Sequence, residues 1–161
     1  EWQCATEQLD FIQPKRFELK YIDKDGTEKM PVMIHKALLG SIERFLSVYI
    51  EHTAGNFPLW LSYHQAVIIP VSNEKHLEYG EEVLAKLKDA GIRVAIDDKN
   101  ESMGNKIRNA QLDKTPYMLV VGDKEAETKT VAVRLRNGTN LGMMSVEELA
   151  ERMKKEIEVK S

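Results

Sequence analysis

The hydrophobic pattern of the second half of the chain places the tightest constraint on its fold. Three short apolar runs, 66–71, 93–96 and 117–121, alternate with two segments of helical periodicity. Apolar residues on the inner faces of these two helices are Leu77, Val83, Leu84 and Leu87 in the first and Met103, Ile107 and Ala110 in the second. Strands that alternate with helices form parallel βαβ units with right-handed crossovers. This half is therefore expected to contain a parallel sheet.

Turn and cap residues extend this prediction to the C-terminus. Ser72 or Asn73 can cap the first helix, and Gly91 suits its C-terminal end. Two further apolar runs, 131–136 and 139–143, flank an Asn-Gly pair that favours a type I′ hairpin turn. Ser145-Val-Glu-Glu148 has the form of a capping box and opens a last helix. The sequence thus predicts an α/β domain with a five-stranded mixed sheet and three helices.

The first part of the chain has a different pattern. Residues 3–11, 17–22 and 32–34 are expected to form antiparallel strands, followed by a helix over residues 37–53. Gly55-Asn-Phe-Pro58 stops that helix. The segment from there to Gln65 is expected to be a connector between two domains. We expect the domain boundary within this connector, which gives one domain over 1–60 and another over 61–161.

Composition narrows the class of protein. The 161 residues carry a net charge of -3, which argues against a histone-like or non-specific nucleic-acid binder. It leaves recognition of a single-stranded RNA loop open, because splayed bases are read by a few placed side chains. No apolar run is long enough to span a bilayer, so no membrane partner is expected. The single cysteine, Cys4, excludes an internal disulfide and favours a cytoplasmic location.

One stretch carries a family resemblance. The sequence Pro31-Val-Met-Ile-His-Lys-Ala-Leu-Leu-Gly-Ser-Ile-Glu-Arg-Phe45 closely resembles motif 3 of class II aminoacyl-tRNA synthetases, in the form found in threonyl-tRNA synthetases. The resemblance continues through residues 2–10 and 97–136. It implies that 1–60 is the C-terminal part of a class II catalytic domain and that 61–161 is the anticodon-binding domain. The implied activity joins threonine to its tRNA through an adenylate made from ATP with magnesium.

The resemblance also assigns roles within 1–60. It implies that His35 is one zinc ligand, whose cysteine and histidine partners in the family have no counterpart here. It implies that Arg44 is a catalytic contact to ATP, and that Gln3 and Gln8 border the adenylate. From the residues alone, a lone histidine after an apolar strand is more often structural, and Arg44 could be a surface charge. Ala5 and Lys36 depart from the glycine and arginine that are usual in the family.

Four residues of 61–161 match family positions that contact the anticodon or adjacent phosphates: Asn100, Arg108, Glu125 and Arg134. Their chemistry suits these roles, because asparagine both donates and accepts, and arginine can form two parallel bonds to a guanine edge. Lys99, Lys106 and Arg136 are expected to add positive charge for the RNA backbone. The alternative for each is a solvated polar residue of a loop.

Motifs 1 and 2 of the class II synthetases are absent from the sequence. We therefore expect a C-terminal piece of a longer ligase, a homodimer in the parent family, and no aminoacylation by this chain alone. The competing hypothesis is a non-catalytic, stand-alone RNA-binding or regulatory module derived from an anticodon-binding domain. The presence of Gln3, Gln8, His35 and Arg44 favours the ligase.

Overall fold

The structure, a computed structural model, describes residues 2–3 and 5–160, so Cys4 lies outside the described residues. The chain divides into two compact units, Glu1–Ala54 and Gly55–Ser161, and each is described by itself. The connector after Ala54 belongs to the second unit because its backbone is bonded there. Arg136 Nη1 donates to the carbonyl of Phe57 over 2.7 Å, and Gln65 Nε2 donates to that of Leu59 over 3.0 Å.

The first unit is built of short elements. In chain order these are β1 (Thr6–Asp10), α1 (Gln13–Arg16), β2 (Tyr21–Ile22), β3 (Glu28–Lys29), β4 (Met33–Ala37) and α2 (Ile42–Thr53). β1 pairs antiparallel with β4, and β2 with β3, as two separate ribbons. The prediction that the helix begins at residue 37 is wrong. β4 continues to Ala37, Gly40 takes a positive φ of 61°, and the Ser41 hydroxyl accepts from the Arg44 amide as the N-cap.

The second unit is an α/β domain. Its elements are η1 (Leu59–Leu61), β5 (Ala66–Pro70), α3 (Asn73–Asp89), β6 (Val94–Ile96), α4 (Met103–Leu112), β7 (Tyr117–Val121), α5 (Asp123–Thr128), β8 (Thr130–Leu135), β9 (Asn140–Ser145) and α6 (Val146–Glu158). The sheet order is β6-β5-β7-β8-β9, with β5 parallel to β6 and β7 and with antiparallel β8 and β9. This confirms the predicted five-stranded mixed sheet. All three predicted helices are present, and α5 is a short additional one.

The hairpin between β8 and β9 differs from the prediction of a type I′ turn. That turn needs a positive φ at both central residues. Gly138 has a φ of 89°, but Asn137 is not among the described residues with positive φ. Gly138 N donates to Leu135 O, and Leu135 N donates to Thr139 O, both over 2.9 Å. The loop therefore contains three residues and ends in a left-handed glycine, which is the type I turn followed by a bulge.

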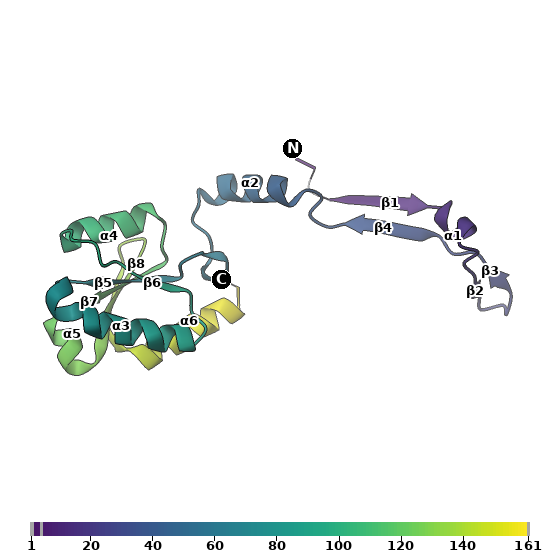
Figure 1. Cartoon of the computed structure of the whole chain (residues 1–161). Coiled ribbons are helices and arrows are strands. Elements are labelled where there is room, and N and C mark those ends of the chain that lie inside the picture. The colour runs from purple at the N-terminus through teal and green to yellow at the C-terminus, as the bar shows by residue number, and fades with distance from the viewer. Residues whose placement is uncertain (1, 4, 161) are drawn as a thin grey trace. The chain divides into compact units, whose positions relative to one another are not determined.

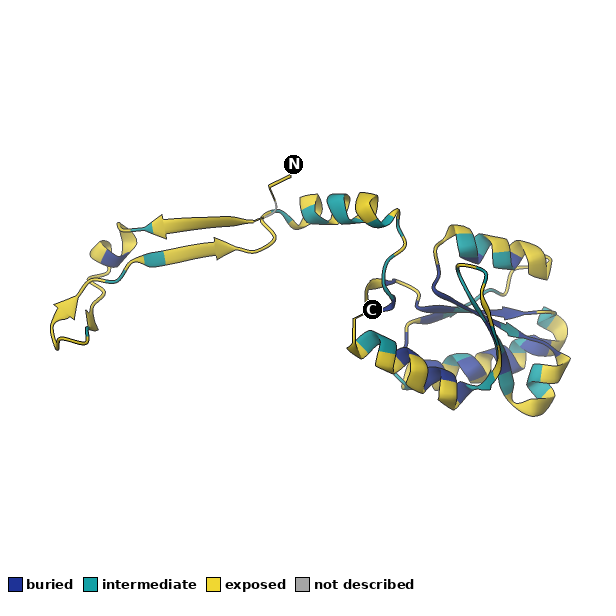
Figure 2. Ribbon diagram, turned by 180° about the vertical axis from the view of Figure 1, so that it is seen from behind, coloured by how far each residue is buried: buried dark blue, intermediate teal, exposed yellow. Residues whose placement is uncertain are grey.

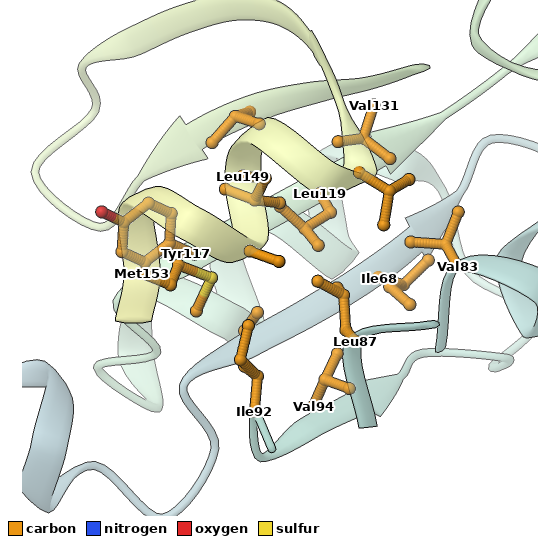
Figure 3. Packing of buried hydrophobic residues seen from close by; sticks show 14 of the residues in the cluster. Ile68, Val83, Leu87, Ile92, Val94, Tyr117, Leu119, Val131, Leu149 and Met153 are labelled. Carbon is orange, nitrogen blue, oxygen red and sulfur yellow. The ribbon is translucent and has the colours of Figure 1, made fainter. Parts of the chain in front are cut away.

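The two faces of the sheet are covered differently. Helices α3 and α6 pack on one face, and α4 lies on the other (Figure 1). The main core lies on the α3 and α6 side, where Ile68, Leu119 and Leu149 are fully buried (Figure 3). A smaller cluster of Ile69, Ala110 and Met118 lies under α4. Opposite faces of the same strands thus serve two separate apolar clusters, as the alternation of side chains along a strand requires.

Candidate functional site

The sheet face under α4 also carries a polar residue. Along β8, Val131 and Val133 point into the main core, so Arg134 points to the opposite face. The register agrees, because Arg134 lies opposite Met118, which belongs to the cluster under α4. Strand periodicity therefore places Arg134 on the face that α4 covers only in part.

One nitrogen of the Arg134 side chain is buried without a hydrogen-bond partner. Among the described residues, its Nε is the only buried side-chain nitrogen or oxygen that has no hydrogen-bond partner. A buried donor without an acceptor costs about 1–3 kcal/mol. A charged donor held in this state is suited to an acceptor supplied by a ligand, such as a base edge or a phosphate oxygen.

Arg108 lies on the same side of the sheet as Arg134, because it belongs to α4, and Asn100 lies in the loop that leads into α4. This loop leaves the carboxyl end of β6. Both side chains are exposed, and neither hydrogen-bonds to another described residue. Both are therefore free to contact a ligand on this face.

Glu125 has a different setting. It is half-buried in the first turn of α5, and its Oε2 accepts from the Gly122 amide over 3.0 Å. Residue Ala126 of the same helix packs against the main core, so α5 belongs to the other side of the sheet from α4. The structure therefore does not bring Glu125 onto the face of Arg134, although both Glu125 and Asn100 follow carboxyl ends of parallel strands.

The polar residues on the α4 side are spread along the strands. Asn100 follows the carboxyl end of β6, whereas Arg134 is paired with Met118 near the start of β7. The strands β6 and β8 are also three inter-strand steps apart in the sheet, which is about 14 Å. Such a separation fits successive unstacked nucleotides of a single-stranded loop better than one small ligand.

Two of the expected backbone-binding cations are engaged within the protein. The prediction that Lys106 is available to RNA is wrong, because the residue is only 2% exposed. Its Nζ donates to Asn73 Oδ1 over 3.1 Å and to Asp97 O over 3.0 Å. Arg136 holds the connector through Phe57. Lys99 is exposed and is the one of the three that remains available.

A cavity of about 450 Å3 opens beside the loop that carries Asn100. Its wall includes Lys99 from the loop and Asn109 from α4, together with Tyr63 and His64 from the connector. Tyr63 is 82% exposed, and its ring meets that of His64 edge to face at 4.5 Å. An exposed aromatic face of this kind can stack on a nucleobase.

The candidate residues of the first unit meet at two places. Arg44 Nη1 donates to the Gln3 carbonyl over 3.3 Å, which joins the start of α2 to the segment before β1. Gln8 lies directly opposite His35 in the pairing of β1 with β4. Lys36, which replaces the usual arginine, forms an ion pair with Glu7. The four family-derived positions Gln3, Gln8, His35 and Arg44 are all exposed.

His35 has one acidic neighbour and no metal site around it. Its Nε2 lies 3.0 Å from Asp10 Oδ2. The pKa of Asp10 lies below its ordinary value because the Gln13 amide, the His35 ring and the Ile12 amide bond its carboxylate. No group of three potential metal ligands exists among the described residues. Because a zinc site needs at least three protein ligands, this part of the chain does not fit zinc by itself.

The structure shows contacts of Asn73 and His76, in the second unit, that the sequence did not predict. Asn73 was expected only as a possible helix cap, yet its amide bonds the backbone of the Asn100 loop. His76 is buried, accepts from the Ser72 amide and lies 3.1 Å from Asp123 Oδ1. The only sequence signal for Asn73 is its position at the start of the first predicted helix, as a possible cap. None of the helices among the described residues combines the length and the apolar character needed to cross a membrane.

Two family models match the chain. The anticodon binding domain matches residues 65–156, and the core domain of class II tRNA synthetases for glycine, histidine, proline, serine and threonine matches residues 1–53. The chain is 53% identical over 157 residues to a threonine–tRNA ligase of Natranaerobius thermophilus, and 56% identical over 149 residues to that of Solidesulfovibrio magneticus. These alignments cover 98% and 92% of the chain but only 24% and 23% of the relatives.

Solved structures agree. The RNA-binding domain of threonyl-tRNA synthetase from Cryptosporidium parvum Iowa II matches 96% of this chain and 39% of its own, with a TM-score of 0.85 and 40% identity. Prolyl-tRNA synthetase from Cryptosporidium parvum, complexed with halofuginone and AMPPNP, gives a TM-score of 0.68 over 98% of this chain and 34% of its own at 24% identity, which supports the fold alone.

Proposed function

This chain belongs to the threonyl-tRNA synthetase family, of which it carries the anticodon-binding domain and part of the class II core, and we propose from this premise that residues 55–161 bind the anticodon loop of threonine tRNA. The proposed surface is the α4 side of the sheet, with Asn100, Arg108 and Arg134 as its contacts. Glu125 is proposed to add a contact from the neighbouring carboxyl edge, through the oxygen that does not cap α5.

The unpartnered Nε of Arg134 carries this proposal. Nothing within the described residues explains why a charged donor stands buried at this point without an acceptor. A base edge with two acceptors, such as guanine, would satisfy the guanidinium with two parallel bonds. The recognition would depend on placed side chains, in agreement with a chain whose net charge is -3.

The activity of the whole protein is a further part of the proposal, because the chain spans about a quarter of the length of these relatives. We infer that the parent joins threonine to its tRNA through an adenylate formed from ATP with magnesium, in the cytoplasm and as a homodimer. Arg44 would stabilise phosphate charge by an oriented guanidinium, and Gln3 and Gln8 would border the adenylate. His35 would supply one ligand to a zinc site that other parts of the ligase complete.

Substitution of Arg134 tests the anticodon proposal. In the full chain, Arg134→Ala should weaken binding of a threonine-anticodon stem-loop by about 1–3 kcal/mol, the scale of a bidentate base contact. It should also remove most of the preference over a stem-loop with a scrambled anticodon. Filter-binding titrations at one fixed salt concentration measure both quantities.

Arg152→Ala is the matched control. Arg152 lies on α6, on the opposite side of the sheet, and is exposed, with one long bond of 3.5 Å from its Nε to the Tyr117 hydroxyl. The control removes the same charge, so it should lower binding to both stem-loops slightly and leave the preference intact. Equal affinity of the unaltered chain for the two stem-loops would refute the proposed function.

A further inference from the structure

The loop that presents Asn100 is fixed at nearly every residue. The Asp97 amide donates to Ile68 O of β5 over 2.9 Å, and the Lys99 amide donates to Asp97 Oδ1 over 3.2 Å. Asn73 Nδ2 donates to the carbonyls of both Asp98 and Lys99. At the far end, Asn109 Nδ2 donates to Glu101 Oε2 over 3.1 Å. The backbone of residues 97–99 and the end of the loop are therefore tied to three different elements.

The buried side chain of Lys106 also bonds the start of this loop and Asn73. Its ammonium group donates to Asp97 O and to Asn73 Oδ1, and more weakly, over 3.5 Å, to Pro70 O. It thus connects the ends of β5 and β6 to the first residue of α3. Asn73 is in turn oriented by this bond, because its oxygen faces Lys106 while its amide faces the loop.

Burial of Lys106 is costly for the fold. The ammonium group is almost fully enclosed, and no carboxylate among the described residues forms an ion pair with it. Removing a charge from water without a counter-charge costs several kcal/mol before hydrogen bonds offset it. An apolar side chain at this position would fill the space without that cost, so stability alone gives a weak reason for a lysine here.

Asn100 contrasts with its neighbours. It is exposed, and its side chain forms no hydrogen bond with any described residue. The fixed backbone on both sides determines where this free amide group points. We propose that Lys106 and Asn73 are positioning residues, which hold the 97–99 backbone so that Asn100 meets a base of the anticodon loop. This inference rests on the proposed function of the same surface.

One substitution separates positioning from general stability. Asn73→Asp keeps an oxygen for Lys106 and turns that contact into an ion pair, but it removes the side-chain amide that donates to Asp98 O and Lys99 O. Lys99 O then keeps only its bond from the Glu101 amide, within the loop itself. The fold should therefore keep its thermal midpoint, while the loop loses its attachment. Lys106→Met is the second variant, since it removes the ammonium group and leaves an apolar chain of similar length.

Hydrogen exchange measures the attachment directly. Both variants should raise exchange at the Lys99 and Glu101 amides by about ten-fold or more, whereas exchange in β7 should stay unchanged. Unchanged exchange in the loop of both variants would overturn the inference, whatever their RNA affinity. The full chain is used in each case.

Binding of the two stem-loops measures the consequence. Asn73→Asp and Lys106→Met should each reduce the preference for the threonine anticodon by about ten-fold, the scale of one specific base contact. Asn105→Asp and Lys88→Met are matched controls, because each makes the same change of charge at an exposed residue whose side chain forms no hydrogen bond to the described 97–102 loop; the Asn105 backbone amide, which donates to Ser102 Oγ, is unchanged by the substitution. The controls should alter affinity for both stem-loops equally and keep the preference.

A double variant shows whether the effect passes through Asn100. In an Asn100→Ala background, Asn73→Asp should change the preference no further, because the group it positions is already absent. Additive losses would overturn the inference, as would full preference in Asn73→Asp itself. If the unaltered chain shows no preference between the two stem-loops, the proposed function fails, and the inference fails with it. If the unaltered chain shows the preference and the variants keep it, only the positioning inference fails. The titration of the unaltered chain therefore distinguishes the two cases.

Discussion

The two units of this chain use their apolar residues in opposite ways. In the second unit, Leu119, Val131 and Leu149 are inaccessible to solvent. In the first unit, Pro14 is the only described residue that is buried, and Leu38 and Ile34 are 70% and 62% exposed. Figure 2 shows the contrast, with dark blue concentrated in the sheet and helices of residues 55–161.

This contrast shows that the local sequence signals for helices and strands do not by themselves produce a packed hydrophobic core. Helix α2 has an N-cap and an amphipathic sequence, and β1 and β4 have a defined register. Isolated two-stranded ribbons and single helices are nonetheless marginal in water, because packing supplies most of their stability. If the proposed function holds, further parts of a synthetase are expected to cover the apolar side chains of the first unit.

The largest expected difference between the units concerns hydrogen exchange. Amides of β5 and β7 should exchange only through global unfolding, at about 5–15 kcal/mol, whereas those of β1 and β4 should exchange with free energies near zero. Exchange of the full chain, followed by mass spectrometry of peptides, measures both. The connector from Phe57 onward should be protected with the second unit. Slow exchange in β1 and β4 would show that the first unit has found another way to bury its surface.

Matched leucine substitutions should give a smaller but clear difference. Leu119→Ala should lower the free energy of unfolding by about 2–5 kcal/mol, because it removes methyl groups from a packed core and leaves a cavity. Leu38→Ala makes the same chemical change at an exposed site and should cost no more than about 0.5 kcal/mol. Urea unfolding followed by circular dichroism measures both variants. Equal costs would contradict the division into a packed unit and an open one.

The smallest expected effect concerns the two His–Asp pairs, one in each unit. The bond from His76 lowers the pKa of Asp123 below its ordinary value of 3.8. Because the pKa is lower in the folded state, this stabilisation is fully present above pH 3.8 and is lost as the pH falls through the folded value. Asp123→Asn should therefore make unfolding of the second unit less sensitive to acid.

Asp10→Asn is the control for this pH effect. The pKa of Asp10 is also lowered, but the residue belongs to the first unit, so its substitution should leave the acid unfolding of the second unit unchanged. Thermal midpoints between pH 3 and pH 6 compare the two variants. Identical profiles for both would mean that the His76 pair does not contribute to the folded second unit.

Much of the fold could be predicted because its signals are local. Apolar runs of four to six residues separated by amphipathic helices determine the βαβ arrangement, and the confirmed sheet follows from them. The missed helix α5 has only six residues and depends on one Glu125 cap, so periodicity could not reveal it. The prediction of a type I′ turn was wrong for a related reason, because an Asn-Gly pair is also compatible with a three-residue hairpin loop.

The residues of the candidate site stay a prediction from the sequence, and their arrangement came from the structure. Arg108 and Arg134 lie on one side of the sheet, and Asn100 lies in the loop that leads into α4. The sequence did not reveal that Glu125 caps a helix on the other side, or that Lys106 is buried. Both facts depend on contacts between residues far apart in the chain, such as that of Lys106 with Asn73.

The sequence by itself determined most of the strands and helices of the second unit and the family of the chain, and it supplied the candidate contacts, because periodicity and motifs depend on residues that are close in the sequence. Only the tertiary structure decided which charges face solvent and which serve the fold. Lys99 and Lys106 look alike in the sequence, yet one is exposed and the other is enclosed beneath the Asn100 loop. Burial and hydrogen bonding depend on segments that meet only when the sheet assembles, and those contacts give each charged group its role.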